Sequence, residues 1–325
     1  MRCIPAALLA ALLASPAAAQ RRDEQTYYPG SFNWAFLHRY PQAARLFNAF
    51  DYGHAVLYEE LYLEPGAPVD RLERREFEFI TADLLRRPPR FAIAEEAVAP
   101  AYTRLAWRAK QMFDWAHLLH RQIYDVYADE RIPAAAKPAL VERLTDYYLS
   151  NRALAFAAVP KSMGLMEEAY YSTAFRRRYP RFNGLIWAYH WLQVGLYEPL
   201  VGAPTPAERA AGVETTVERF WAMVNSPATG FPQLMPMTPA VAPRFTARHP
   251  RAAAIFDNLH MMHDIISDIL ASGRVSRADK AKVIAAALAE FRDGTRNTMS
   301  GEEWRQMAEM MGGVARMGGA AWPPP

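Results

Sequence analysis

Cysteine is almost absent from this sequence, and its absence excludes several kinds of site. The only cysteine is Cys3, close to the N-terminus. The chain therefore offers no disulfide within itself, no set of thiolate metal ligands and no Cys-x-x-Cys-His motif for covalent haem. A chain of this length can fold without disulfides, because about 300 residues bury a large hydrophobic core.

A strong charge of either sign is also missing. The formal net charge is +3 and the sequence pI is about 8.9, and there is no lysine-rich run or aromatic-basic module, so we expect no nucleic-acid partner. Beyond the N-terminal segment, no apolar run is long enough to span a bilayer, so we expect no membrane span. Sustained period-two alternation is absent as well, which predicts almost no β-sheet.

The first residues have the pattern of a secretory signal peptide. Met1-Arg2 precedes an apolar run over 6–14 and an alanine cluster over 17–19. This order of basic, apolar and small residues predicts cleavage after Ala19. We therefore expect a soluble, exported protein that is periplasmic or secreted, with 1–19 removed.

One fourteen-residue pattern occurs four times and contains most of the histidines. The copies are LFNAFDYGHAVLYE from Leu46, MFDWAHLLHRQIYD from Met112, LIWAYHWLQVGLYE from Leu185 and IFDNLHMMHDIISD from Ile255. When the copies are stacked, the first column holds Asp51, His117, His190 and His260, and the second holds His54, His120, Gln193 and His263. Imidazoles at matched depths on four helices are typical of a metal site inside a helical bundle.

The self-similarity extends beyond these four segments. Ala35-Phe36 and Arg39-Tyr40-Pro41 match Ala174-Phe175 and Arg178-Tyr179-Pro180. The second and fourth copies match over a longer span. We therefore predict an all-α, internally duplicated helical bundle, with two similar halves around a central four-helix His/Asp site. The expected units are a first helical repeat over 20–160, a second over 161–299, and a Met-rich C-terminal helix and tail over 300–325.

Turn and capping signals set the expected helices. They are 41–62, 70–86, 100–129, 135–150, 162–176, 181–199, 206–224, 250–272 and 277–293, with a final helix from Ser300. Ser300 and Glu303 form a capping box at the start of that last helix. The proline-rich stretch 225–243 is expected to be a loop.

The helical spacing places the histidines together on one shoulder of each helix. At about 100° per residue, His117, His120 and Tyr124 form one narrow stripe beside the apolar face. Two ligand layers three residues apart differ by about 4.5 Å in rise, which suits one metal with a hydrogen-bonded layer or two metals. The predicted metal ligands are Asp51, His54, His117, His120, His190, His260 and His263, with His117, His120, His260 and His263 as the core set. His38 and His249 fall outside the columns. A metal-free network of His–Asp hydrogen bonds is the alternative.

A third column is acidic and a fourth is aromatic. Glu59, Asp125, Glu198 and Asp268 lie about 80° from the histidines, so we expect them, with Asp114 and Asp257, in a second layer around the metal. Tyr58, Tyr124 and Tyr197 share one position, where Ser267 stands in the fourth copy. They are the candidate catalytic residues, as proton or electron relays.

The ligand types favour a transition metal, with iron preferred and copper or zinc possible. We therefore expect a non-haem, metal-dependent oxidoreductase with a mono- or dinuclear centre. The alternatives are a non-catalytic metal-binding or sensing protein, and a b-type haem protein for electron transfer. The arrangement is similar to that of di-iron carboxylate bundles, but those sites are rich in glutamate whereas this one is rich in histidine. The sequence indicates neither a substrate, nor a redox partner, nor an oligomeric state.

Overall fold

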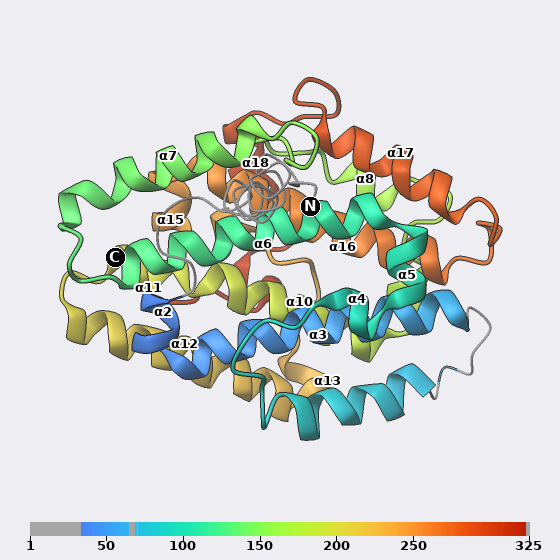
Figure 1. The fold of residues 1–325 in the computed structure, drawn as a ribbon, viewed down its shortest axis with the longest axis horizontal. Coiled ribbons are helices and arrows are strands. Elements are labelled where there is room, and N and C mark those ends of the chain that lie inside the picture. The colour runs from blue at the N-terminus through green and yellow to red at the C-terminus, as the bar shows by residue number, and fades with distance from the viewer. Residues whose placement is uncertain (1–33, 65–68, 70, 323–325) are drawn as a thin grey trace, which may run out of the picture.

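The protein is all-helical in a computed structural model, which describes residues 34–64, 69 and 71–322 (Figure 1). The predicted signal peptide lies outside the described residues. Within the described part of the chain, the only β-type pairing is an isolated bridge between Lys161 and Thr298. A search of that part found no helix long and apolar enough to cross a membrane.

Four long helices carry the repeated pattern and run through the middle of the bundle (Figure 1). They are α3 (Pro41–Leu63), α6 (Trp107–Ala128), α10 (Pro180–Gly195) and α16 (Pro250–Ala271). Helix α16 packs on both α3 and α6, and α10 packs on α3. Gly53 allows α10 to come close, because a Cβ at this position would lie 3.3 Å from the ring of Tyr189. The four pattern segments therefore converge as predicted.

A short helix precedes each of the four. These are α2 (Ala35–Arg39), α5 (Pro100–Leu105), α9 (Ala174–Arg178) and α15 (Pro243–Arg248). The joining residue has nearly the same non-helical backbone at every junction, with φ between −134° and −129°. At Tyr40, Tyr179 and His249 the following proline disfavours the α conformation. Ala106 bends in the same way before Trp107, so the single helix predicted over 100–129 is wrong.

Outer helices cover the four central ones. Helices α7 (Lys137–Ser150), α12 (Pro206–Asn225) and α17 (Lys280–Arg292) pack on α6, α10 and α16 respectively. The remaining elements are α4 (Glu95–Val98), η3 (Ala134–Ala136), α8 (Gly164–Glu167), α11 (Tyr197–Gly202), α13 (Pro227–Gly230), α14 (Thr238–Val241), α18 (Gly301–Met310) and η4 (Val314–Met317). The predicted capping box is present, since Ser300 Oγ accepts from the Glu303 amide and the Glu303 side chain binds the Ser300 amide.

Four other expected elements also differ from the structure. The helix expected over 181–199 breaks at Leu196 into α10 and α11. The segment predicted as a helix over 70–86 winds as two π-helical stretches, η1 (Arg71–Glu76) and η2 (Phe79–Leu84). The helix expected over 162–176 divides into α8 and α9, separated by Thr173 in the left-handed conformation with φ of 64°. The proline-rich loop contains the short helices α13 and α14. The order of helices is similar in the two halves, whereas their duplication stays a prediction.

Candidate metal centre

The four central helices bring all six column histidines into one buried cluster. Neighbouring rings have centroids 4.1–6.4 Å apart, and the members are His54, His117, His120, His190, His260 and His263. Each of the six side chains is at most 5% exposed. The two histidine columns therefore meet in space, although they come from segments more than 200 residues apart in the sequence.

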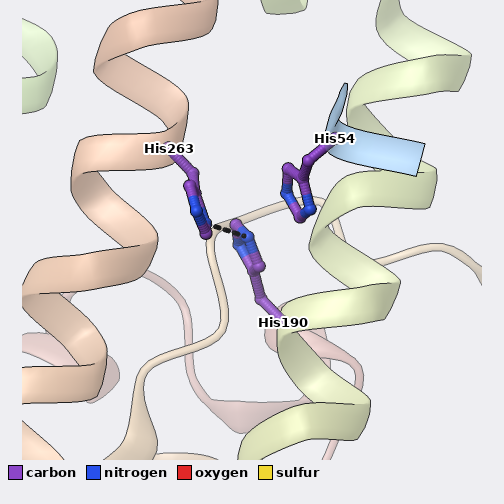
Figure 2. A group of neighbouring side chains, drawn as sticks. All are labelled: His54, His190 and His263. Atoms are coloured by element: carbon purple, nitrogen blue, oxygen red, sulfur yellow. Dashed lines mark hydrogen bonds between the residues drawn. The ribbon is translucent and has the colours of Figure 1, made fainter. Parts of the chain in front are cut away.

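The tightest group joins three different helices (Figure 2). One nitrogen from each of His54 on α3, His190 on α10 and His263 on α16 lies within 4.8 Å of the others. His263 Nδ1 is 3.3 Å from His190 Nε2. His54 Nδ1 donates to the Phe50 carbonyl at 3.0 Å, which leaves the lone pair on Nε2. That arrangement is the usual one for a ligating histidine, whose second nitrogen is held by a carbonyl.

This grouping differs from the predicted one. The predicted core set was His117, His120, His260 and His263, with His54 and His190 beside it, whereas the structure gathers His54 and His190 with His263. His260 Nε2 lies 3.2 Å from the Gln193 amide oxygen. His120 Nδ1 lies 2.7 Å from the Tyr197 hydroxyl.

Many polar atoms of the cluster are buried without a hydrogen-bond partner. They are His54 Nε2, His117 Nε2, His120 Nε2, His190 Nδ1, His260 Nδ1 and Gln193 Nε2. Burial is the main cause that lowers the pKa of every column histidine, and it lowers that of His54 to about 4. Neighbouring imidazoles lower the pKa of His54 and His190 further. The rings are therefore neutral near pH 7, the state that binds metal.

A second group lies beside the first. Atoms of Asp51 on α3, Glu95 on α4 and His117 on α6 fall within 4.8 Å of one another. Asp51 Oδ2 is 2.5 Å from Arg121 Nη2, and Asp51 Oδ1 is 3.3 Å from His117 Nδ1. Burial, together with the charges of Asp114 and Asp51, raises the pKa of the Glu95 carboxyl well above its ordinary value.

Two members of this second group were missed from the sequence. Glu95 stands outside the four repeated segments, at the start of a four-residue helix, so no periodicity marks it. Arg121 lies within the second copy, directly after His120, and also binds the Asn48 side chain at 2.7 Å. At about 100° per residue, Arg121 lies about 40° from His117 on the side away from the apolar residues, so the helical pattern gave no signal that it would be buried.

The acidic column does something different from what the sequence predicted. Each carboxylate accepts hydrogen bonds from backbone amides at the start of a short helix, as follows: Glu59 from Ala101 and Tyr102, Asp125 from Trp34 and Phe36, Glu198 from Arg244 and Phe245, and Asp268 from Thr173 and Phe175. Negative charge is favourable at a helix start, where amides lack intrahelical partners. These bonds hold the starts of the short helices and do not reach the imidazoles.

Asp114 and Asp257 were also expected to orient histidines. Asp114 is half-exposed and pairs with Lys110. Asp257 is buried and accepts hydrogen bonds from the Thr238 amide at 2.9 Å and from Trp304 Nε1 at 2.8 Å. It thereby holds α14 and α18 against α16, and burial raises its pKa to about 7. Its hydrogen bonds give it a structural role.

The tyrosine column links helices diagonally across the cluster. The Tyr58 hydroxyl donates to the His263 carbonyl at 3.3 Å, and the Tyr124 hydroxyl donates to the Gln193 carbonyl. Tyr197 contacts both the carbonyl and the Nδ1 of His120. Of the three candidate relays, Tyr197 is thus the one hydrogen-bonded to a column imidazole, among the contacts of the described residues.

The two histidines outside the columns lie away from the cluster. His38 is exposed on α2. His249 is buried at the bend before α16, and its Nε2 lies 2.6 Å from the Tyr127 hydroxyl. Burial and the nearby Arg248 lower the pKa of His249 to about 4.

Comparison with known proteins gives no further assignment. No protein-family model, no curated protein and no solved structure matches the chain. The geometry of the site shows buried His, Asp and Glu groups that could hold a metal ion.

Proposed function

We propose that this protein binds a transition metal at the histidine cluster and acts as a metal-dependent oxidoreductase. The observation that carries the proposal is the group of His54, His190 and His263, whose nitrogens lie within 4.8 Å of one another in the core. Three imidazoles from three helices are a common protein ligand set for a catalytic metal.

The energetics of burial support a metal over a hydrogen-bond network. Each unpaired buried polar atom costs about 1–3 kcal/mol. A network would pair the imidazole nitrogens with donors or acceptors, yet those of His54, His190 and His260 include unpartnered atoms. A bound cation would offset this cost by accepting their lone pairs.

The type of ligand limits which metals suit the site. Neutral imidazole suits iron, copper and zinc, and iron is the metal that we favour for redox chemistry. When bound, such a metal would supply electron transfer or activation of a small molecule. Three protein nitrogens would leave a coordination position open. The chain's own contribution is to keep the ligands neutral and pre-oriented, and Tyr197 can hold or pass a proton at His120 Nδ1.

Different observations bear on the two alternative functions. A non-catalytic metal-binding protein is favoured by the near-complete burial of His54, His190 and His263. A b-type haem protein fits less well, because the rings of His190 and His260 stack at 4.1 Å with an interplanar angle of 7° rather than facing each other across an apolar slot. Export, indicated by the N-terminal pattern, remains part of the proposal.

Metal analysis of the purified exported protein is the direct test. We expect at least one metal ion per chain and a charge-transfer band without the Soret band of haem. His190→Ala and His263→Ala should each lose most of the metal. His249→Ala is the matched control, because it removes another buried imidazole outside the cluster and should keep the metal. Equal metal content in all these variants, or none in the native protein, would refute the proposal.

A further inference from the structure

The acidic group beside the histidine cluster has the features of a separate cation site. Asp51, Glu95 and His117 come from three different helices and are between 5% and 7% exposed. Asp51 Oδ1 and His117 Nε2 are both buried without a hydrogen-bond partner. A cluster of carboxylates alone would not define a site, but unpartnered ligand atoms within the same group point to something that binds them.

Acidic residues outnumber basic ones around this group. Arg121 pairs with Oδ2 of Asp51, whereas Oδ1 lies 3.3 Å from His117 Nδ1 without a hydrogen bond. The charged residues that line the adjoining pocket are the acids Asp51, Glu95, Glu96 and Asp114 and the bases Lys110 and Arg121. Acids therefore outnumber bases by two, and if all of them are ionised a divalent cation would balance the difference. Burying carboxylates without such compensation is costly.

The acidic group also has access to small molecules. A pocket of about 400 Å³ is lined by Asp51, Glu95 and His117 together with the side chains of Trp107 and Trp115. The residues that line it do not include His54, His190 or His263. A molecule that enters this pocket therefore meets the acidic group before it meets His54, His190 and His263.

We propose that Asp51, Glu95 and His117 bind a second divalent cation, and that this position is the one small-molecule substrates reach. Two carboxylates and one imidazole are harder ligands than three imidazoles, so the site favours Mn²⁺ or Fe²⁺ over copper. This inference rests on the proposed function in one respect, because it takes a first metal to be held by His54, His190 and His263.

The two positions are close enough to act together. The rings of His117 and His263 have centroids 5.6 Å apart, and Asp51 precedes His54 on the same face of α3 by three residues, about 4.5 Å of rise. Dinuclear centres place their metals at about 3.5–4 Å. The geometry therefore assigns unlike ligand sets to two neighbouring metals, one enclosed and one open to the pocket.

A manganese titration tests this assignment. The metal-free full chain is loaded with one equivalent of Zn²⁺ and then titrated with Mn²⁺, and free Mn²⁺ is followed by its electron paramagnetic resonance signal. We expect one further equivalent of Mn²⁺ to bind. Glu95→Gln should weaken Mn²⁺ binding by about tenfold or more and leave the zinc content unchanged. Glu96→Gln is the matched control, since it removes the same charge from the neighbouring residue in the same pocket.

The outcomes separate this proposal from the previous one. Mn²⁺ binding that weakens equally in Glu95→Gln and Glu96→Gln would mean that the pocket attracts cations only through its overall charge, and would overturn the second site. Zinc binding without any Mn²⁺ binding would overturn it as well, while leaving the histidine site intact. Failure to bind zinc would refute the proposed function itself. In His190→Ala, loss of tight zinc binding with Mn²⁺ binding retained would show that the two sites are distinct.

Discussion

The histidine columns and the acidic column belong to the same four repeated segments, yet their polar atoms differ in whether they have hydrogen-bond partners. Glu59, Asp125, Glu198 and Asp268 each bind backbone amides at a helix start. The imidazoles five to eight residues earlier keep several nitrogens without any partner. Both sets are largely buried, so solvent does not explain the difference.

This difference separates structural polar residues from candidate functional ones. Buried polar groups in proteins are almost always hydrogen-bonded, and the exceptions need an explanation. The carboxylates follow the rule and hold the starts of the short helices. Several imidazoles at one place lack such hydrogen-bond partners, which indicates that a ligand binds there.

The largest expected effect comes from removing the metal. The three histidines come together only in the folded state, so the metal binds that state and not the unfolded chain. At a free metal concentration about a thousandfold above the Kd, binding adds about 4 kcal/mol to the free energy of unfolding. Chelation should lower the melting temperature of the native protein accordingly. Thermal melts before and after verified metal removal measure this effect. An unchanged melting temperature would place the imidazoles with the carboxylates, as structural groups.

Replacing an acidic-column residue should have the next largest effect, on stability alone. Asp125→Ala leaves the amides of Trp34 and Phe36 without their acceptor, so we expect a loss of about 3 kcal/mol in the free energy of unfolding. Asp268→Ala should cost a similar amount, because it caps α9 through Thr173 and Phe175 in the same way. Denaturant titrations give both values.

Metal content tests the same difference between the acidic column and the histidines. Both aspartate variants should bind metal as the native protein does, once they are folded. Asp125→Asn and Asp268→Asn keep one acceptor oxygen and should cost less than the alanine variants. Loss of metal in a folded Asp125→Asn variant would return the acidic column to the layer around the metal that the sequence analysis assigned to it.

The sequence was sufficient for the parts of the fold that periodicity controls. The central helices and the meeting of the two histidine columns follow from apolar spacing and from matched positions in the repeats. The bend at Ala106 did not follow, because a proline comes after each of the other three bends and Trp107 comes after this one. Glu59 holds the start of α5 before this bend, through the amides of Ala101 and Tyr102, from far away in the sequence. Hydrogen bonds to distant amides leave no local pattern.

The grouping of the ligands could not be predicted for a similar reason. Alignment gives the depth of a residue along its helix but not the rotation of one helix against another. That rotation places His54 and His190 next to His263, and leaves His120 beside Tyr197. Glu95 enters the site through tertiary packing of α4 on α3, which no repeat encodes.

The buried histidine outside the columns gives a smaller, pH-dependent effect. The pKa of His249 is lowered to about 4, so the unfolded chain binds a proton between about pH 6.5 and 4 that the native state does not. Its contribution to stability is therefore complete above about pH 6.5 and is lost as the pH falls. We expect the native protein to lose about 2 kcal/mol more than His249→Gln between pH 7 and pH 4.5. Denaturant titrations at the two pH values measure this difference, and equal losses would contradict it.

The smallest effect distinguishes the tyrosines from one another. Tyr58→Phe removes one hydrogen bond, to the His263 carbonyl, and should cost about 1 kcal/mol. Tyr197→Phe also leaves His120 Nδ1 without its partner, so it should cost about 1 kcal/mol more. Imidazole nitrogen NMR should then show a changed His120 tautomer in Tyr197→Phe but not in Tyr58→Phe. If neither variant changes the His120 signals, Tyr197 belongs with the other tyrosines as a link between helices, and its candidacy as a proton relay ends.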